Sequence, residues 1–177
     1  MDRPDIYIFG SWKAIITFLV FAIIIGYFVF GPFGKLLDKS LGEKLIEAKF
    51  FVRASEIEMY IRKIPSSSVQ IFVYFHVVDS FFALFYALFL WSLVVRIFSK
   101  NLELANSFLT LIPLFGGICD LLENITLILA KFFESKIPSV FFLPISSFIT
   151  LKFLFLFASL VLIVIGIIIS IIKKATG

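Results

Sequence analysis

The sequence predicts an all-α integral membrane protein, a single domain over residues 1–177 built as a four-helix bundle. Hydrophobic residues make up 61% of the 177 residues, whereas soluble domains are closer to half apolar. Four apolar segments are each long enough for a spanning helix, which needs roughly 20 residues. The short alternating segments that build a membrane β-barrel are not found in the sequence.

Turn and capping residues separate the four apolar segments. The segments occupy about residues 12–30, 69–98, 107–132 and 146–172. Gly-Pro-Phe-Gly at 31–34 predicts the end of the first helix, because glycine and proline disfavour helix interiors. Asn106 or Ser107 is expected to cap the third helix, and the fourth is expected to begin after Pro144. At 1.5 Å per residue the last three helices reach ~35–40 Å, so they are expected to tilt or to extend into the headgroups.

The polar segment 35–68, between the first two spans, is expected to lie at the membrane surface. Its apolar residues fall at helical spacing between charged residues, which predicts an amphipathic helix. These apolar positions are Leu36, Leu37, Leu41, Leu45 and Val52. Ile57, Met59 and Ile61 alternate with polar residues further on, a pattern that also permits a short strand. We interpret the segment as a packed connector, with a docking surface for a partner as the alternative.

Charge and composition restrict the partners that the sequence predicts. A net charge of +4 is too small to indicate a nucleic-acid partner. The basic residues lie mostly beside the apolar segments, so the lipid bilayer is the expected surroundings. They are more numerous on the side of the long loop, which places this loop in the cytoplasm. With one histidine and one cysteine, the sequence predicts no metal site, which needs three or four ligands, and no cofactor.

The third apolar segment carries Asp120, Glu123 and Asn124 within five positions. An ionisable side chain at membrane depth costs at least ~2.5–3.5 kcal/mol, so these residues are expected to face the bundle interior. They continue a stripe, at spacings of three and four, that includes Gly116 and Gly117. Small residues on such a stripe let a neighbouring helix approach closely.

Matching stripes run along the second and fourth segments. The stripe on the second segment comprises His76, Asp79, Ser80, Ala83 and Ala87, with Tyr86 beside it. On the fourth segment, the small residues that share a face with Lys152 are Ser159, Gly166 and Ser170.

The depths of the polar residues overlap. Short connections make neighbouring helices antiparallel, which places Asp79 and Glu123 ~13–15 Å from the long-loop side. By the same count His76 and Lys152 lie ~9–10 Å deep and Asp120 ~18 Å deep. We therefore expect one hydrogen-bonded cluster, with Asp120 beyond it. Its members are His76, Asp79, Glu123, Asn124 and Lys152.

Each of these residues also has a plainer interpretation. Asp120, Glu123 and Asn124 can be a polar lock that fixes helix register, a binding site for a ligand or ion, or part of a catalytic site. His76 is expected to be a hydrogen-bonded packing residue rather than a metal ligand. Lys152 can instead extend its ammonium group to the headgroups.

The polar motifs resemble those of a family. "LIPLFGGICDLLENITLIL", with its Asp-x-x-Glu-Asn core, resembles the third transmembrane helix of a group of small uncharacterised four-span membrane proteins, mostly bacterial. "DSFFALFYALFL" at 79–90, where Tyr86 follows Asp79 by seven positions, and Lys152 early in the last helix extend the resemblance to three spans. The resemblance implies a four-span fold and carries no activity. A looser likeness, in architecture alone, is to the sterol-isomerase and sigma-two-receptor group.

Three functions are compatible with these patterns. The first is a non-enzymatic membrane protein that acts by assembly with itself or with other membrane subunits, its polar cluster locking the bundle. The second is a binding protein or enzyme for a lipid or another apolar molecule, with Asp79, Asp120 and Glu123 at the polar end of an aromatic-lined pocket. Its walls would be Phe75, Phe81, Phe82, Phe85 and Tyr86. The third is proton or ion transfer, which the lack of internal repeats disfavours.

Overall fold

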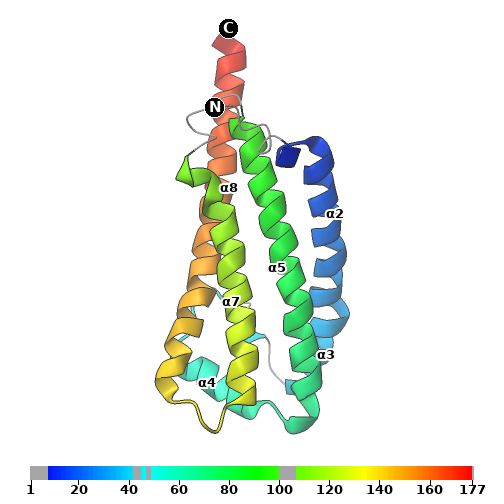
Figure 1. Cartoon of the computed structure of the whole chain (residues 1–177), viewed down its shortest axis with the longest axis vertical. Helices are drawn as coiled ribbons and strands as arrows, with labels where there is room; N and C mark the ends of the chain where they lie inside the picture. The colour runs from blue at the N-terminus through cyan, green and yellow to red at the C-terminus, as the bar shows by residue number, and fades with distance from the viewer. Residues whose placement is uncertain (1–7, 42–44, 47–48, 100–106, 177) are drawn as a thin grey trace.

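The computed structural model describes residues 8–41, 45–46, 49–99 and 107–176. These residues form α-helices joined by short 3-10 and π-helical turns, and they contain no β-strand. The long helices lie side by side along one axis (Figure 1). The expected all-α helical bundle is therefore confirmed.

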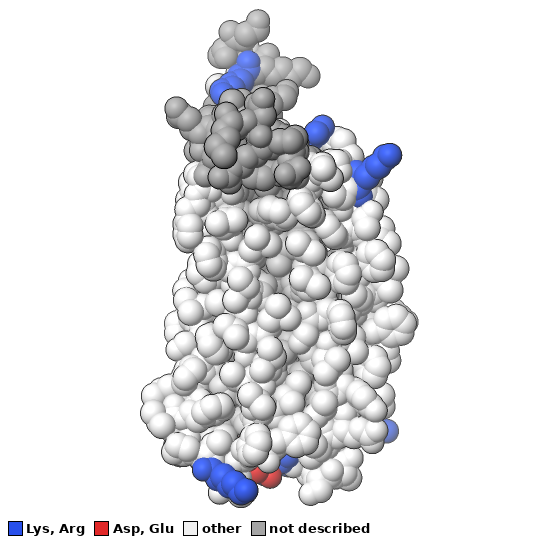
Figure 2. Space-filling model, viewed as in Figure 1, with Lys and Arg blue, Asp and Glu red and all other residues white. Residues whose placement is uncertain are grey.

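Four long helices build the bundle. They are α2 (Trp12–Phe28), α5 (Val69–Phe98), α7 (Ile112–Phe132) and α8 (Phe142–Thr176). α7 packs against both α5 and α8, and α2 packs on the outer side of α5 (Figure 1). With their flanking turns, all four are long and apolar enough to cross a bilayer. Figure 2 shows Lys and Arg only at the two ends of the visible face, with an uncharged band between them, as expected of a multi-pass membrane protein.

The first helix does not end at Gly-Pro-Phe-Gly, and that expectation is wrong. The chain passes from α2 through a π-helical turn, Val29–Phe33, into α3, Gly34–Leu41. A proline ring normally clashes with the carbonyl four residues earlier, and a wider turn relieves such a clash. The backbone N–H of Gly34 donates to the Val29 carbonyl, five residues back. The helix thus absorbs Pro32 by widening for one turn.

The other long helices begin after 3-10 turns. α5 covers Val69–Phe98, as expected, after the turn Ser66–Ser68. Ser107 precedes the turn Phe108–Leu111 that leads into α7, while Asn106 lies outside the described residues. α8 begins at Phe142, four residues before the expected start. Pro144 falls in its first turn, where the backbone N–H groups have no intrahelical partner to lose.

The long loop is helical in two places. The amphipathic helix expected from Leu36 to Val52 is found only as far as Leu41, as α3. Leu45 and Val52 are buried, but they lie outside any α-helix. The segment that permitted a short strand is α4, Ala54–Lys63. α4 packs against the ends of α7 and α8 at the lower end of the bundle in Figure 1. The loop is therefore packed onto the helix ends.

Two apolar cores occupy different levels of the bundle. The loop-end core joins α4 to the nearby ends of α5, α7 and α8, and it includes Ile57, Ile61, Phe72, Phe75, Leu127, Ile145 and Ile149. The far core lies toward the other end and includes Ala83, Ala87, Leu90, Val94, Phe98 and Ile163. Between the two levels, α5, α7 and α8 carry buried polar residues.

Gly117 allows α7 to approach α5. A Cβ at this position would lie 2.5 Å from the Ala87 Cβ and 3.3 Å from the Ala83 carbonyl oxygen. Neither atom can rotate away, so Gly117→Ala must push the two helices apart. We expect this to lower the free energy of unfolding in detergent by about 1–3 kcal/mol.

Gly31 is the matched control for this prediction. Apart from its chain neighbours and the backbone of its own helix, a Cβ at Gly31 would meet no atom within 4 Å. Gly31→Ala should therefore change the free energy of unfolding by less than about 1 kcal/mol, because removing a helical glycine is favourable whereas Pro32 disfavours a helical residue with a Cβ before it. Equal losses in the two variants would show that close approach at Gly117 is not what matters.

Candidate functional site

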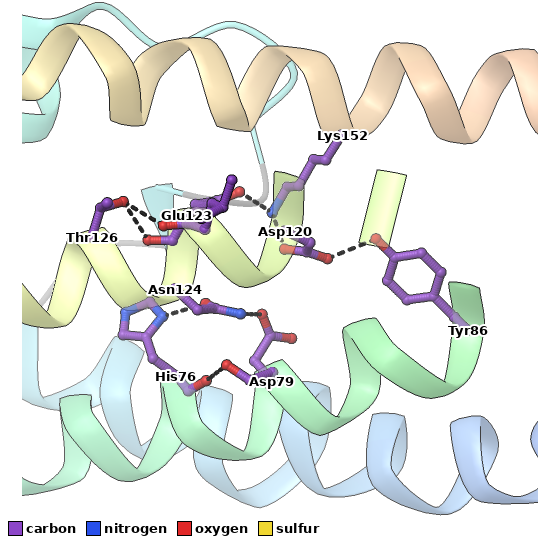
Figure 3. Close-up of polar contacts among 10 residues, drawn as sticks. His76, Asp79, Tyr86, Asp120, Glu123, Asn124, Thr126 and Lys152 are labelled. Atoms are coloured by element: carbon purple, nitrogen blue, oxygen red, sulfur yellow. Dashed lines mark hydrogen bonds and ion pairs between the residues drawn. The ribbon is translucent and has the colours of Figure 1, made fainter. Parts of the chain in front are cut away.

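A buried polar layer crosses the bundle between the two apolar cores. Its seven residues come from three helices and are each at most 9% exposed. They are His76, Asp79 and Tyr86 on α5, Asp120, Glu123 and Asn124 on α7, and Lys152 on α8. The structure thus brings together all seven residues that the sequence singled out (Figure 3). They divide into an ionic part and an amide part.

Lys152 is the centre of the ionic part. Its Nζ lies 3.0 Å from Asp120 Oδ1 and 2.7 Å from Glu123 Oε2. The Tyr86 hydroxyl donates to the other carboxylate oxygen of Asp120 at 2.9 Å. Lys152 lies in the cluster as expected and does not extend to the headgroups, while one expectation is corrected: Asp120 belongs to the cluster rather than lying beyond it. α5, α7 and α8 are linked through these four side chains.

Asn124 is the centre of the amide part. Its Oδ1 lies 2.8 Å from His76 Nδ1, and its Nδ2 donates to Asp79 Oδ2 at 3.0 Å (Figure 3). His76 also contacts the rings of Phe72 and Phe75 edge to face, at centroid distances of 4.3 and 5.2 Å. His76 is therefore a hydrogen-bonded residue at the border of the loop-end core, as its plainer interpretation supposed.

The spacing on α7 explains how one helix serves both parts. Asp120 and Glu123 reach toward α8, while Asn124, one position later, reaches toward α5. One turn earlier, Gly116 and Gly117 follow the same division. A Cβ at Gly116 would lie 3.3 Å from the Phe155 Cβ on α8, whereas Gly117 faces α5. The paired glycines bring both neighbours close enough for the polar side chains to meet.

A further buried lysine, Lys131, was not singled out by the sequence. Its Nζ donates to the carbonyls of Ile61 and Ile64 at 3.1 and 2.8 Å, and it pairs with Glu134 at 2.6 Å. The carbonyls belong to the C-terminal end of α4, where the Ile61 carbonyl also accepts from the Ile64 N–H and the last carbonyls of a helix generally need partners from outside it. Lys131 therefore fastens α4 to the end of α7. The position of Lys131 at the end of an apolar segment in the sequence suggested only a contact with lipid headgroups.

Side chains at the surface also fasten α4. Glu58 accepts from the Ser139 hydroxyl at 3.1 Å and from Arg62 at 2.9 Å. The hydrogen bond from Ser139, followed by that from Arg62, lowers the pKa of the Glu58 carboxyl below its usual value. This contact stabilises the fold above the ordinary pKa of a glutamate and weakens as the pH falls through the lowered value. Because Glu58 is partly exposed to solvent, which screens the interaction, we assign it a minor role.

The aromatic residues proposed as pocket walls do not surround the polar layer as a set. Phe75 belongs to the loop-end core and Phe81 is exposed on the outside of the bundle. Phe82 lies against Gly26 of α2, and Phe85 stacks on Phe21 of α2. Tyr86 alone among them donates to a layer carboxylate. The aromatic wall is therefore divided among a core, the lipid-facing surface and the α2 contact.

Most polar groups of the layer are paired with one another. In the described part of the chain, no three His, Cys, Asp or Glu side chains are placed to hold a metal ion. Comparison with known protein families, with characterised proteins and with solved structures finds no match to this chain. The function must therefore be argued from the geometry of the chain itself.

Proposed function

We propose that this chain is a non-enzymatic multi-pass membrane protein that acts by assembly with itself or with other membrane subunits. The polar layer would lock the internal register of the bundle, and the outside of α8 would meet the partner. We also propose that the long loop faces the cytoplasm. An impermeant thiol reagent applied to intact cells that carry Ser67→Cys, an exposed loop position, would report this side.

The observation that carries the assembly proposal is the length of α8. Gly166 of α8 lies against Ile97 and Phe98, the last residues of α5. The remaining ten residues, to Thr176, extend ~15 Å further at 1.5 Å per residue. Figure 1 shows this end of α8 projecting beyond the other long helices.

The first six residues of the projecting part of α8, 167–172, are all isoleucine except Ser170. Its exposed isoleucines are Ile167, Ile168, Ile169, Ile171 and Ile172. At the same end, Arg96 lies 5.4 Å over the ring of Trp12, and a Trp–Arg pair of this kind is typical of the headgroup layer. The isoleucines therefore extend past the level at which the other helices meet the headgroups. Apolar surface there is best stabilised by another protein surface.

The internal pairing of the layer favours a locking role over the alternatives. Lys152, Asp120 and Tyr86 satisfy one another, as do Asn124 and Asp79. Apolar cores on both sides also separate the layer from the two ends of the bundle. Lipid binding and the transfer of ions across the membrane both need an open path from outside, so they have less support.

Photo-crosslinking at α8 tests the assembly proposal. A photoreactive amino acid at Ile171, which is 63% exposed, should form protein crosslinks in native membranes. The same probe at Ile23 on α2, which is 62% exposed, should form lipid adducts only. The two positions match in residue type and exposure, so only their location differs. Lipid adducts alone at both positions would overturn the proposal.

A further inference from the structure

The side chain of Asn124 has a definite direction. Its amide has one end that accepts hydrogen bonds and one end that donates them. The Oδ1 end lies 2.8 Å from His76 Nδ1, and the Nδ2 end lies 3.0 Å from Asp79 Oδ2. The amide bridges His76 and Asp79. If Asp79 accepts from the NH₂ end, the carbonyl end faces His76, and if Asp79 donates to the carbonyl end, the NH₂ end faces His76.

The ionised state of Asp79 therefore fixes the hydrogen on His76, and protonation of Asp79 removes that constraint. An ionised carboxylate can only accept, so it holds the NH₂ end of Asn124 and turns the carbonyl toward His76. His76 Nδ1 must then carry a hydrogen, and a neutral ring leaves Nε2 bare. A protonated Asp79 can donate to the Asn124 carbonyl. The NH₂ end then faces His76, where only a bare Nδ1 can accept from it.

We propose that His76, Asn124 and Asp79 form a proton-linked relay, in which protonation of Asp79 reverses the Asn124 amide and moves the His76 hydrogen from Nδ1 to Nε2. The net change is the uptake of one proton by Asp79. His76 gives up the hydrogen on Nδ1 and takes one on Nε2, both by exchange with solvent protons during brief local openings of the bundle, so its charge does not change. The layer would thus hold a binding site for a single proton.

Among the surroundings of His76, Asn124 is the group that determines the tautomer of the imidazole ring. His76 is fully buried, and its Nε2 has no hydrogen-bond partner among the residues that the structure describes. Phe72 and Phe75 lie edge to face with the imidazole. Neither phenyl ring offers a strong hydrogen-bonding group that would favour one tautomer. The contact at Nδ1 is therefore the one that discriminates between the tautomers.

Other charged groups near Asp79 set the pH at which it titrates. Lys152 on α8 and Tyr86 on α5 lie within electrostatic range of the Asp79 carboxyl. α7 contributes Asp120 and Glu123, both of which pair with Lys152. The titratable residues of the other described helices packed on α5 are Lys13 and Tyr27 on α2 and Lys35, Asp38 and Lys39 on α3. Of these groups, Lys152 and Tyr86 interact electrostatically with Asp79, so they shift the pH midpoint of the relay but do not change which hydrogen bonds it contains.

The composition of the chain makes the relay directly observable. His76 is the single histidine, so protein labelled with ¹⁵N-histidine gives the signals of one ring. A nitrogen that carries hydrogen and a bare nitrogen give well-separated ¹⁵N signals. The full-length protein in lipid nanodiscs would be titrated from about pH 8 to about pH 4, a range that covers carboxyl groups and histidine.

We expect the bare-nitrogen signal to belong to Nε2 at the alkaline end and to pass to Nδ1 as Asp79 takes up its proton. Asp79→Asn keeps the size of the side chain but cannot titrate, so its His76 tautomer should not change with pH. Ser92→Ala, which removes another buried polar group of α5, should keep the wild-type response.

Three results would overturn the relay. One is a bare Nδ1 at the alkaline end. Another is a pH-dependent exchange that persists in Asp79→Asn. The third is a wild-type ring that keeps one tautomer, or passes directly to the doubly protonated form, over the whole folded range. The wild-type titration alone distinguishes the first and third results, so the test does not depend on a variant that folds.

Discussion

Lys152→Met should lower the free energy of unfolding by about 3–5 kcal/mol, the cost of leaving buried charges without their partner. The Lys152 ammonium lies within 3.0 Å of both Asp120 and Glu123, and all three side chains are almost fully buried. Methionine fills a similar volume but leaves two carboxyl groups facing each other. The loss should therefore exceed that of a single neutral interhelical hydrogen bond, which averages only ~0.6 kcal/mol in membranes.

A second substitution should restore part of this loss. Glu123→Gln in the Lys152→Met background removes one of the two orphaned carboxylates and keeps the shape of the side chain. Asp120→Asn, added to that pair, should restore more, although it also changes the acceptor of the Tyr86 hydroxyl. Such coupling between neighbours is what a double-mutant cycle measures.

Unfolding in detergent with a mixed-micelle denaturant provides the measurement. Lys173→Met is the control, because Lys173 is exposed near the end of the same helix and should contribute little. If the effects of Lys152→Met and Glu123→Gln simply add, the ionic part of the layer is not a coupled unit. The locking role proposed for it would then fail.

The sequence predicted the members of the polar layer better than their pairing. Stripes of polar and small residues at helical spacing identify the faces of α5, α7 and α8 that meet, because exposing a polar face to lipid is costly. Depths counted along straight helices placed Asp120 beyond Lys152. The count neglected the lysine stem, which is long enough to reach carboxylates three residues apart, a rise of ~4.5 Å. Tyr86 was placed only beside its stripe, yet its hydroxyl reaches Asp120.

Helix ends and the loop were harder to predict, since tertiary packing decides them. Pro32 is a local signal for a helix end, but the chain widens into a π-helical turn there and continues to Leu41. The alternation in α4 fits a strand as well as a helix. The burial of Ile57, Tyr60 and Ile61 beneath the bundle selects the helix. A pattern within one segment contains no information about the surface that will cover it.

Lys131 shows the same limit for a polar residue. A lysine at the end of an apolar helix is typical of headgroup contact, so its sequence neighbours give no reason to expect burial. Its partners, the carbonyls of Ile61 and Ile64, lie about seventy residues away in the chain. The contact depends on α4 crossing the end of α7, which follows from the apolar face of α4 rather than from Lys131. Only the folded arrangement identifies this lysine as structural.

Lys131→Met should therefore destabilise the protein and loosen α4 in particular. The change removes two charge-assisted hydrogen bonds to carbonyls and the ion pair with Glu134. Hydrogen bonds to charged groups contribute about 1.5–3 kcal/mol each, and water can replace part of them at the bundle end, so we expect a net loss of about 2–3 kcal/mol. Amide hydrogen exchange in residues 54–63 should accelerate more than in α5 or α7, because α4 can open locally.

Lys136→Met is the matched control for Lys131→Met, since Lys136 is exposed on the connection that follows α7. It should change the free energy of unfolding by no more than about 0.5 kcal/mol, as is usual for surface substitutions. The rate of amide hydrogen exchange in α4 should stay close to that of the wild type. If the two lysine variants behave alike, the ammonium group of Lys131 does not hold α4. Faster amide exchange spread evenly over all helices would instead show that Lys131 stabilises the whole bundle and does not specifically hold α4 in place.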